Sequence, residues 1–152
     1  MNTSIEKAPW HLWLVGILSL LWNAFGCYDY TMTQLRDRAY IEATMAPMGL
    51  TYEESMAFFD SFPAFASALW ALGVWGSLAG AILLLIRSRH AVTAFLVSLI
   101  GALGSFAYQF SMEMPAAMAE SSMARVMPLV IIVLVILQWW YSRRQTAAGV
   151  LR

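Results

Sequence analysis

One stretch of sequence decides the fold of this chain: residues 10–34, WHLWLVGILSLLWNAFGCYDYTMTQ. At 1.5 Å per residue, a helix of this length crosses the roughly 30 Å hydrocarbon core of a bilayer. The run contains an amide, Asn23, and a carboxylate, Asp29, and it is the only apolar run of the chain with a charge set into it. It therefore predicts a membrane-spanning helix that the later apolar segments must pack against or shield.

The composition also indicates a membrane protein. Of the 152 residues, 61% are hydrophobic and 12% are charged, whereas soluble domains have about 45–50% and about 25%. Further apolar runs at residues 64–86, 91–110 and 124–141 complete four predicted spans, the last with Gln138 at its interfacial end. We expect an all-α integral membrane four-helix bundle of two hairpins, forming a single transmembrane domain over residues 1–152.

The positions of the arginines predict how the chain is threaded. The turn after the second span and the C-terminal segment are rich in arginine, whereas residues 35–60 hold two Arg against five acids. Because positive residues favour the cytoplasmic side, we expect both termini and the turn at 87–90 in the cytoplasm. The predicted anchors in anionic headgroups are Arg87, Arg89, Arg143 and Arg144. Residues 1–9 are expected to form a short polar tail, and the residues after Arg144 a disordered one.

The first long loop, which this threading places in the periplasm or the exterior, carries several helix signals. Residues 31–45 contain neither Gly nor Pro, so the first helix is predicted to continue through them, and residues 46–49, Ala-Pro-Met-Gly, then break it. Thr51 and Glu54 form a capping-box pattern. It predicts a short amphipathic helix over residues 52–60.

Small residues at helical spacing mark two helix-packing faces. Such residues let helix backbones approach closely inside a membrane. They are Gly73, Gly76, Ser77 and Gly80 in the second span, and Gly101 and Gly104 in the third.

Asp29 and Asn23 are the leading candidates for a ligand or ion site. Asp29 is expected near the outer end of the first span, with Tyr30, Tyr108 and Gln109 as its hydrogen-bonding neighbours. Two interpretations remain open. In one, Asp29 is solvated by headgroups and Asn23 bonds to another helix. In the other, these residues line an outward-facing polar pocket for a cation, a proton or the amine of a ligand.

Other chemistry has little support in the sequence. The single cysteine, Cys27, excludes a disulfide within the chain. Met112 and Met114 are a weak alternative as soft ligands for Cu(I), and otherwise we predict neither metal nor cofactor. No zinc-protease motif, nucleophile elbow or phosphate loop occurs in the sequence, so we expect no enzyme activity. A formal net charge of zero argues against nucleic acid as a partner.

Three passages carry a family resemblance: LLWNAFGCYDYTMTQ, DSFPAFASALWALGVWG and LLLIRSRHAVTAFLVSLIGALGSFAYQ. They resemble small four-helix inner-membrane proteins of proteobacteria, some of which are labelled sugar transporters. The resemblance extends over roughly residues 10–110. It implies a multi-pass protein of the bacterial inner membrane, and it implies no activity.

Two functional hypotheses follow. The first is a non-enzymatic accessory or structural protein that docks on a larger membrane assembly or on lipid through its small-residue faces, with another integral membrane protein or a second copy as partner. The second is a small oligomeric transporter or channel in which Asp29 is the ion- or substrate-coupling carboxylate.

Overall fold

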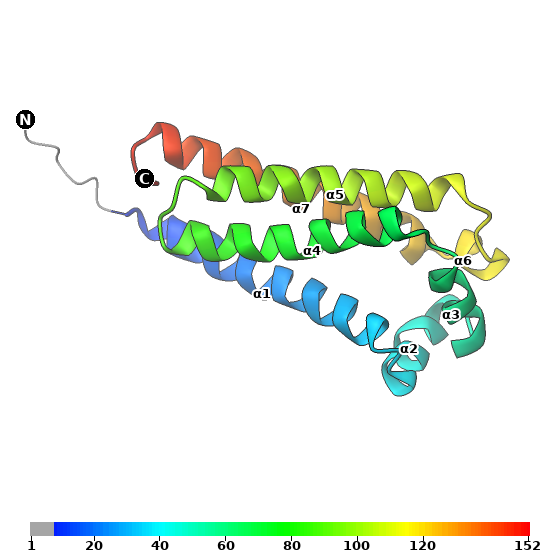
Figure 1. The fold of residues 1–152 in the computed structure, drawn as a ribbon. Coiled ribbons are helices and arrows are strands. Elements are labelled where there is room, and N and C mark those ends of the chain that lie inside the picture. Colours follow the sequence, from blue (N-terminus) through cyan, green and yellow to red (C-terminus); the bar gives the residue numbers. More distant parts are fainter. Residues whose placement is uncertain (1–7) are drawn as a thin grey trace, which may run out of the picture.

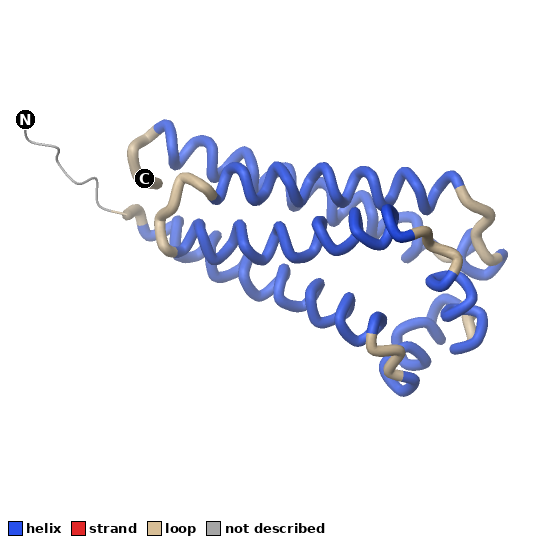
Figure 2. Tube along the Cα trace, viewed as in Figure 1, coloured by secondary structure: helices blue, strands red, loops and turns tan. Residues whose placement is uncertain are grey.

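The structure, a computed structural model, describes residues 8–152 and is built from helices in that range. Most of the polar tail expected over residues 1–9 therefore lies outside the described residues. The long helices lie side by side, and the connections gather at the two ends of the bundle (Figures 1 and 2). In order, the helices are α1 (Trp10–Gln34), α2 (Arg38–Met45), the short 3-10 helix η1 (Ala46–Met48), α3 (Tyr52–Asp60), α4 (Ala64–Leu85), α5 (Ala91–Ser111), α6 (Ala116–Glu120) and α7 (Ser122–Ala147).

Four of these helices, α1, α4, α5 and α7, are long and apolar enough to cross a membrane. Their outer faces leave large apolar side chains uncovered: Leu21 is 64% exposed, Ile100 58% and Leu129 63%. A water-soluble bundle would bury these faces, whereas lipid solvates them. The chain is therefore a multi-pass membrane protein, as its composition predicted.

The closest helix contact is between α4 and α5, where the two small-residue faces meet. A Cβ added to Gly101 would lie 2.6 Å from the backbone nitrogen of Gly73, and one added to Gly76 would lie 3.1 Å from that of Ser98. The Ser98 hydroxyl donates to the carbonyl of Gly73 at 2.6 Å. These faces are thus occupied within the chain, and they are not free to receive another protein.

The first helix does not continue to Met45, contrary to the sequence prediction. It ends at Gln34, and Arg36 adopts a left-handed backbone conformation with φ 56°. Asp37 then caps the start of α2, because its side chain accepts a hydrogen bond from the backbone N–H of Tyr40 at 2.8 Å. The prediction considered only Gly and Pro as breaks and overlooked an aspartate in an N-cap position.

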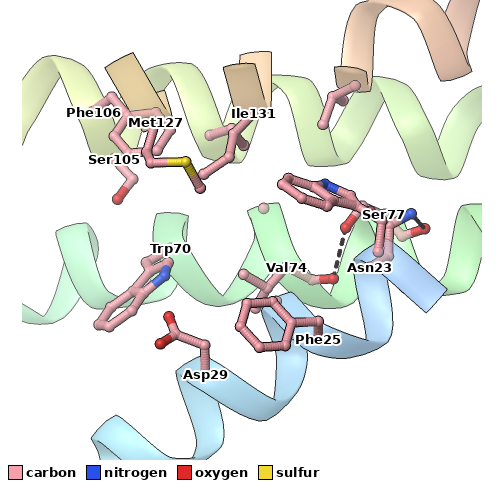
Figure 3. A pocket seen from close by; sticks show the side chains of 15 residues that line it. Asn23, Phe25, Asp29, Trp70, Val74, Ser77, Ser105, Phe106, Met127 and Ile131 are labelled. Carbon is pink, nitrogen blue, oxygen red and sulfur yellow. Dashed lines mark hydrogen bonds between the residues drawn. The ribbon is translucent and has the colours of Figure 1, made fainter. Parts of the chain in front are cut away.

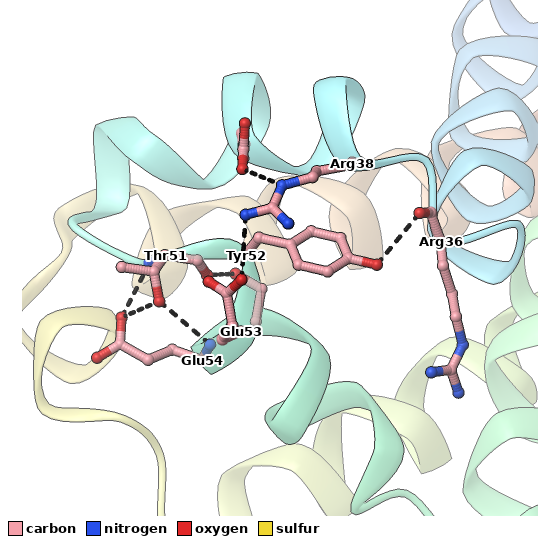
Figure 4. Close-up of polar contacts among 8 residues, drawn as sticks. Arg36, Arg38, Thr51, Tyr52, Glu53 and Glu54 are labelled. Atoms are coloured by element: carbon pink, nitrogen blue, oxygen red, sulfur yellow. Dashed lines mark hydrogen bonds and ion pairs between the residues drawn. The ribbon is translucent and has the colours of Figure 1, made fainter.

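Helices α2, η1 and α3 form a compact unit at one end of the bundle, which we call the cap (residues 38–60). The predicted capping box is present: Thr51 and Glu54 bond reciprocally at the start of α3, as Figure 4 shows. The predicted break is present too, since Gly49 follows η1 with φ 78°. Ile41, Met45, Leu50 and Met56 form the small apolar core of the cap.

Ion pairs hold the outer surface of the cap. Arg38 pairs with Glu42 at 2.7 Å and with Glu53 at 3.1 Å (Figure 4), and Arg36 pairs with Asp60 at 2.7 Å. All of these side chains are about half exposed or more. Each pair therefore contributes little stability, and the charges of this segment lie on its outside.

The C-terminal segment is ordered, contrary to the prediction of a disordered tail. Helix α7 runs six residues beyond the predicted span end at 141, to Ala147. After Gly149 the chain turns, and Val150 and Leu151 enter an apolar cluster with Leu12, Leu84 and Phe95. Arg152 exchanges backbone hydrogen bonds of 2.8 Å with Arg87 and Arg89. The two apolar residues near the chain end supply the burial that the prediction overlooked.

Candidate functional site

A polar contact joins three of the long helices in the middle of the bundle. The side-chain amide of Asn23 on α1 donates to the carbonyl oxygen of Ser77 on α4 at 3.0 Å and to Oε1 of Gln138 on α7 at 3.4 Å. Asn23, Ser77 and Gln138 are all buried. The interpretation in which Asn23 bonds to another helix is confirmed, and Gln138, which was expected at the interfacial end of the last span, is buried in this contact. Because α7 is longer than expected, Gln138 lies well inside it.

Between this contact and the cap, the four long helices surround a cavity of about 150 Å³. Helices α1 and α4 diverge toward the cap (Figure 1), and the cavity lies in that half of the bundle. On α1 the lining residues include Asn23, Gly26 and Asp29, which follow one another at helical spacing. Most of the other lining side chains are apolar.

A second cavity, of about 320 Å³, adjoins the first beneath the cap. Its walls are rich in methionine and phenylalanine from the cap, α5, the α5–α7 connection and α7. Both cavities share part of their lining, namely Phe25, Asp29, Trp70, Phe106, Met127 and Ile131. The two spaces therefore meet at the level of Asp29.

Asp29 is held by one hydrogen bond from the cap. The hydroxyl of Tyr40 on α2 donates to Oδ1 of Asp29 at 2.8 Å. Burial and this hydrogen bond raise the pKa of Tyr40 to about 12. Figure 3 shows the Asp29 carboxylate directed into the space between α1 and α4, close to Trp70. Within residues 8–152, no Lys, Arg or His forms an ion pair with Asp29.

The hydrogen-bonded cluster predicted around Asp29 does not form. The ring of Tyr30 packs edge-on against Trp70 at 4.9 Å, and that of Tyr108 packs against Phe65 at 5.3 Å. Gln109 donates to the hydroxyl of Ser105 at 3.1 Å, although it does line the second cavity together with Asp29. The prediction placed Tyr108 and Gln109 at a depth similar to that of Asp29, but similar depth alone does not bring side chains together, and these side chains contact other residues.

Tyr40 is the site residue that the sequence prediction missed. It lies eleven residues after Asp29, so a continuous helix would have carried it about 16 Å away along the axis. The break at Arg36 returns α2 to the end of α1 and brings the phenol to the carboxylate. The N-cap pattern at Asp37 was the available signal, since an N-cap marks a new helix.

A groove runs along the seam between α1 and α7. Helix α1 packs chiefly on α4, and α7 chiefly on α5, so α1 and α7 make little direct contact. The groove measures about 380 Å³, and Trp22 lines both this groove and the inner cavity. At the end opposite the cap, a hydrogen bond of 2.5 Å between Nδ1 of His11 and the hydroxyl of Tyr141 closes the seam.

The predicted anchor residues lie at the opposite end of the bundle, and only Met114 of the two candidate metal ligands borders this site. Among the described residues, no group of three or more His, Cys, Asp or Glu is arranged to hold a metal ion. Met114 lines the second cavity among apolar neighbours. At the opposite end, Nε of Arg87 donates to the carbonyl of Val150 at 3.1 Å, while Arg143 and Arg144 lie over the rings of Trp139 and Trp140.

Comparison of the chain with known protein families, curated proteins and solved structures finds no match.

Proposed function

We propose that this protein is a non-enzymatic accessory protein of the bacterial inner membrane that binds a lipid-like molecule in the cavities between its helices. The observation that carries the proposal is the pair of adjoining, mainly apolar cavities of about 150 and 320 Å³ inside a membrane bundle. An apolar cavity of about 150 Å³ accommodates a group of the size of benzene. Ligand sites in general span about 300–1,000 Å³.

The bilayer is the natural source of such a molecule. The seam between α1 and α7 faces lipid, and its groove shares Trp22 with the inner cavity. An alkyl chain that enters there leaves one apolar medium for another, so it needs no passage through water. Methionine and phenylalanine around the second cavity suit an adaptable apolar ligand, because thioether side chains repack easily.

The proposed threading keeps both termini and the α4–α5 turn in the cytoplasm and the cap in the periplasm. Its support is the charge pattern: the end of the bundle away from the cap holds Arg87, Arg89, Arg143, Arg144 and Arg152, whereas residues 35–60 at the cap end hold two arginines against five acids. In this arrangement the lipid site opens in the outer half of the membrane. Since the glycine faces are used between α4 and α5, any docking on a larger assembly would use other surfaces.

Transport through one copy is the weaker candidate. Beyond Asn23, on the side away from the cap, the bundle is filled by Leu12, Leu84 and Phe95, each 0% exposed. A pathway lined by Asp29 would therefore stop at the middle of the bundle. The transporter hypothesis consequently needs a second copy or a large rearrangement.

A cavity-filling variant tests the proposal. Gly26 borders the inner cavity, and a Cβ built on it meets nothing within 4 Å, so Gly26→Leu has room to begin a side chain that reduces the cavity volume. Ala24→Leu is the matched control, because Ala24 is exposed on the same helix. The full chain in neutral maltoside micelles is titrated with 1-dodecanol, and ligand binding is followed as a rise in thermal stability.

We expect dodecanol to stabilise the unmodified chain and the Ala24→Leu variant, and to have at most a small effect on Gly26→Leu. If dodecanol stabilises all three chains equally, or none of them, the proposed lipid site is wrong.

A further inference from the structure

We infer that the site prefers an amphiphile with a single apolar tail and a cationic ammonium head, held by Asp29 at the junction of the two cavities. This inference rests on the proposed lipid-binding function and specifies the chemistry of the ligand. It follows from the charge, the surroundings and the position of one side chain.

Asp29 is the only ionisable side chain among the described residues that line either cavity. Its Oδ1 accepts from the neutral phenol of Tyr40, and no residue of the range 8–152 donates to Oδ2. A carboxylate next to apolar walls is costly unless a cation or several donors compensate its charge. Arg36, a cation on the same end of the bundle, is paired with Asp60. An ammonium group supplied by a ligand would provide the missing charge and donors.

The side chains around the carboxylate suit an organic cation. Phe25 and Trp70 line both cavities beside Asp29, and Figure 3 shows all three around the same space. Aromatic faces attract ammonium groups through cation–π interactions, and they also pack against the first methylenes of a tail. A hydrated metal ion finds fewer partners here, because hard cations require several oxygen ligands.

The position of Asp29 allows the tail to enter apolar space in two directions. The inner cavity extends toward Asn23, roughly 9 Å along the helix axis. The second cavity extends beneath the cap, between methionine and phenylalanine side chains. Tyr40 fixes one carboxylate oxygen from outside, so the other oxygen is free to accept from the ligand.

The test compares ligands that share a tail and differ in the head. The full chain in neutral maltoside micelles is titrated with dodecylamine, with 1-dodecanol and with lysophosphatidylethanolamine, again by thermal stabilisation. Asp29→Asn removes the charge and keeps the side-chain shape. Glu120→Gln is the matched control, since Glu120 is exposed on α6 and lines neither cavity.

We expect dodecylamine to bind about 10- to 100-fold more tightly than dodecanol at neutral pH, as for hydrogen bonds to a charged group. Asp29→Asn should abolish this difference, whereas Glu120→Gln should preserve it. Asp29-dependent binding of lysophosphatidylethanolamine would identify a lipid headgroup as the source of the ammonium group. Binding of dodecylamine alone would identify a free lipophilic amine.

The two proposals fail in different ways. If dodecanol and dodecylamine bind equally well and Asp29→Asn changes neither, the cationic preference is wrong while the lipid site stands. If no ligand stabilises the chain, the lipid site itself is wrong. An equal loss of amine preference in Glu120→Gln would show that general surface charge, not Asp29, attracts the amine.

Discussion

Replacing Gly101 by alanine is expected to destabilise the bundle, because α4 and α5 touch backbone to backbone at this point. An added Cβ would lie 2.6 Å from the backbone nitrogen of Gly73, 2.7 Å from the carbonyl oxygen of Leu69 and 3.0 Å from the carbonyl carbon of Leu72. Ordinary contact begins at 3.4 Å, so the closest approach is short by 3.4 − 2.6 = 0.8 Å. Since all three atoms belong to the backbone, no side chain can rotate away and the helices must separate.

The size of the effect follows from two opposing contributions. Overpacking of this kind costs about 1–3 kcal/mol, while alanine is intrinsically favoured over glycine in a helix by up to about 1 kcal/mol. The net expectation for Gly101→Ala is a loss of about 1–2 kcal/mol, or roughly a 5- to 30-fold change in the folded-to-unfolded ratio. Gly26→Ala is the matched comparison, because its Cβ meets nothing within 4 Å. It should be neutral, or stabilising by up to about 1 kcal/mol.

Both variants can be measured by unfolding the full chain from maltoside micelles with sodium dodecyl sulfate and following helix content by circular dichroism. The reasoning predicts that Gly101→Ala unfolds at less dodecyl sulfate than the unmodified chain, and Gly26→Ala at the same amount or more. If Gly101→Ala is as stable as the unmodified chain, the close contact between α4 and α5 does not exist in the membrane protein. If Gly26→Ala loses as much stability as Gly101→Ala, the loss comes from replacing a glycine in general and not from the close approach of the α4 and α5 backbones.

Two further predictions concern the ends of the bundle. The pKa of Tyr40 is raised from 10.0 to about 12. The protonated phenol therefore stabilises the cap fully below pH 10, and this stability is lost as the pH rises through about 12. A tyrosinate absorbance step near pH 12 that is missing in Tyr40→Phe would support this prediction, and an unchanged titration in that variant would refute it. Leu151 is 3% exposed, so Leu151→Ser should lower the free energy of unfolding by about 2 kcal/mol. Ala148 is a nearby exposed residue, and Ala148→Ser should change this free energy little. Equal dodecyl sulfate midpoints for the two variants would contradict the packing of the C-terminal segment on the bundle.

The sequence determined the features that depend on neighbouring residues. A span requires only a long apolar run, so the positions of α4 and α5 and the start of α1 followed from composition, to within a residue or so. The sequence also predicted the capping box of Thr51 and Glu54 and the break at Gly49, because each depends only on residues three or four positions apart.

Only the tertiary structure decided which distant groups meet. Asp29 bonds to Tyr40 because a turn at Arg36 brings α2 back, and Asn23 meets Gln138 because α7 packs in a particular rotation and register. Val150 and Leu151 become ordered only because a cluster around Leu12 and Phe95 is there to receive them. The cavities, too, arise from the divergence of α1 from α4. In each case the outcome depends on how whole helices are oriented, which the local pattern of polar and apolar residues leaves undetermined.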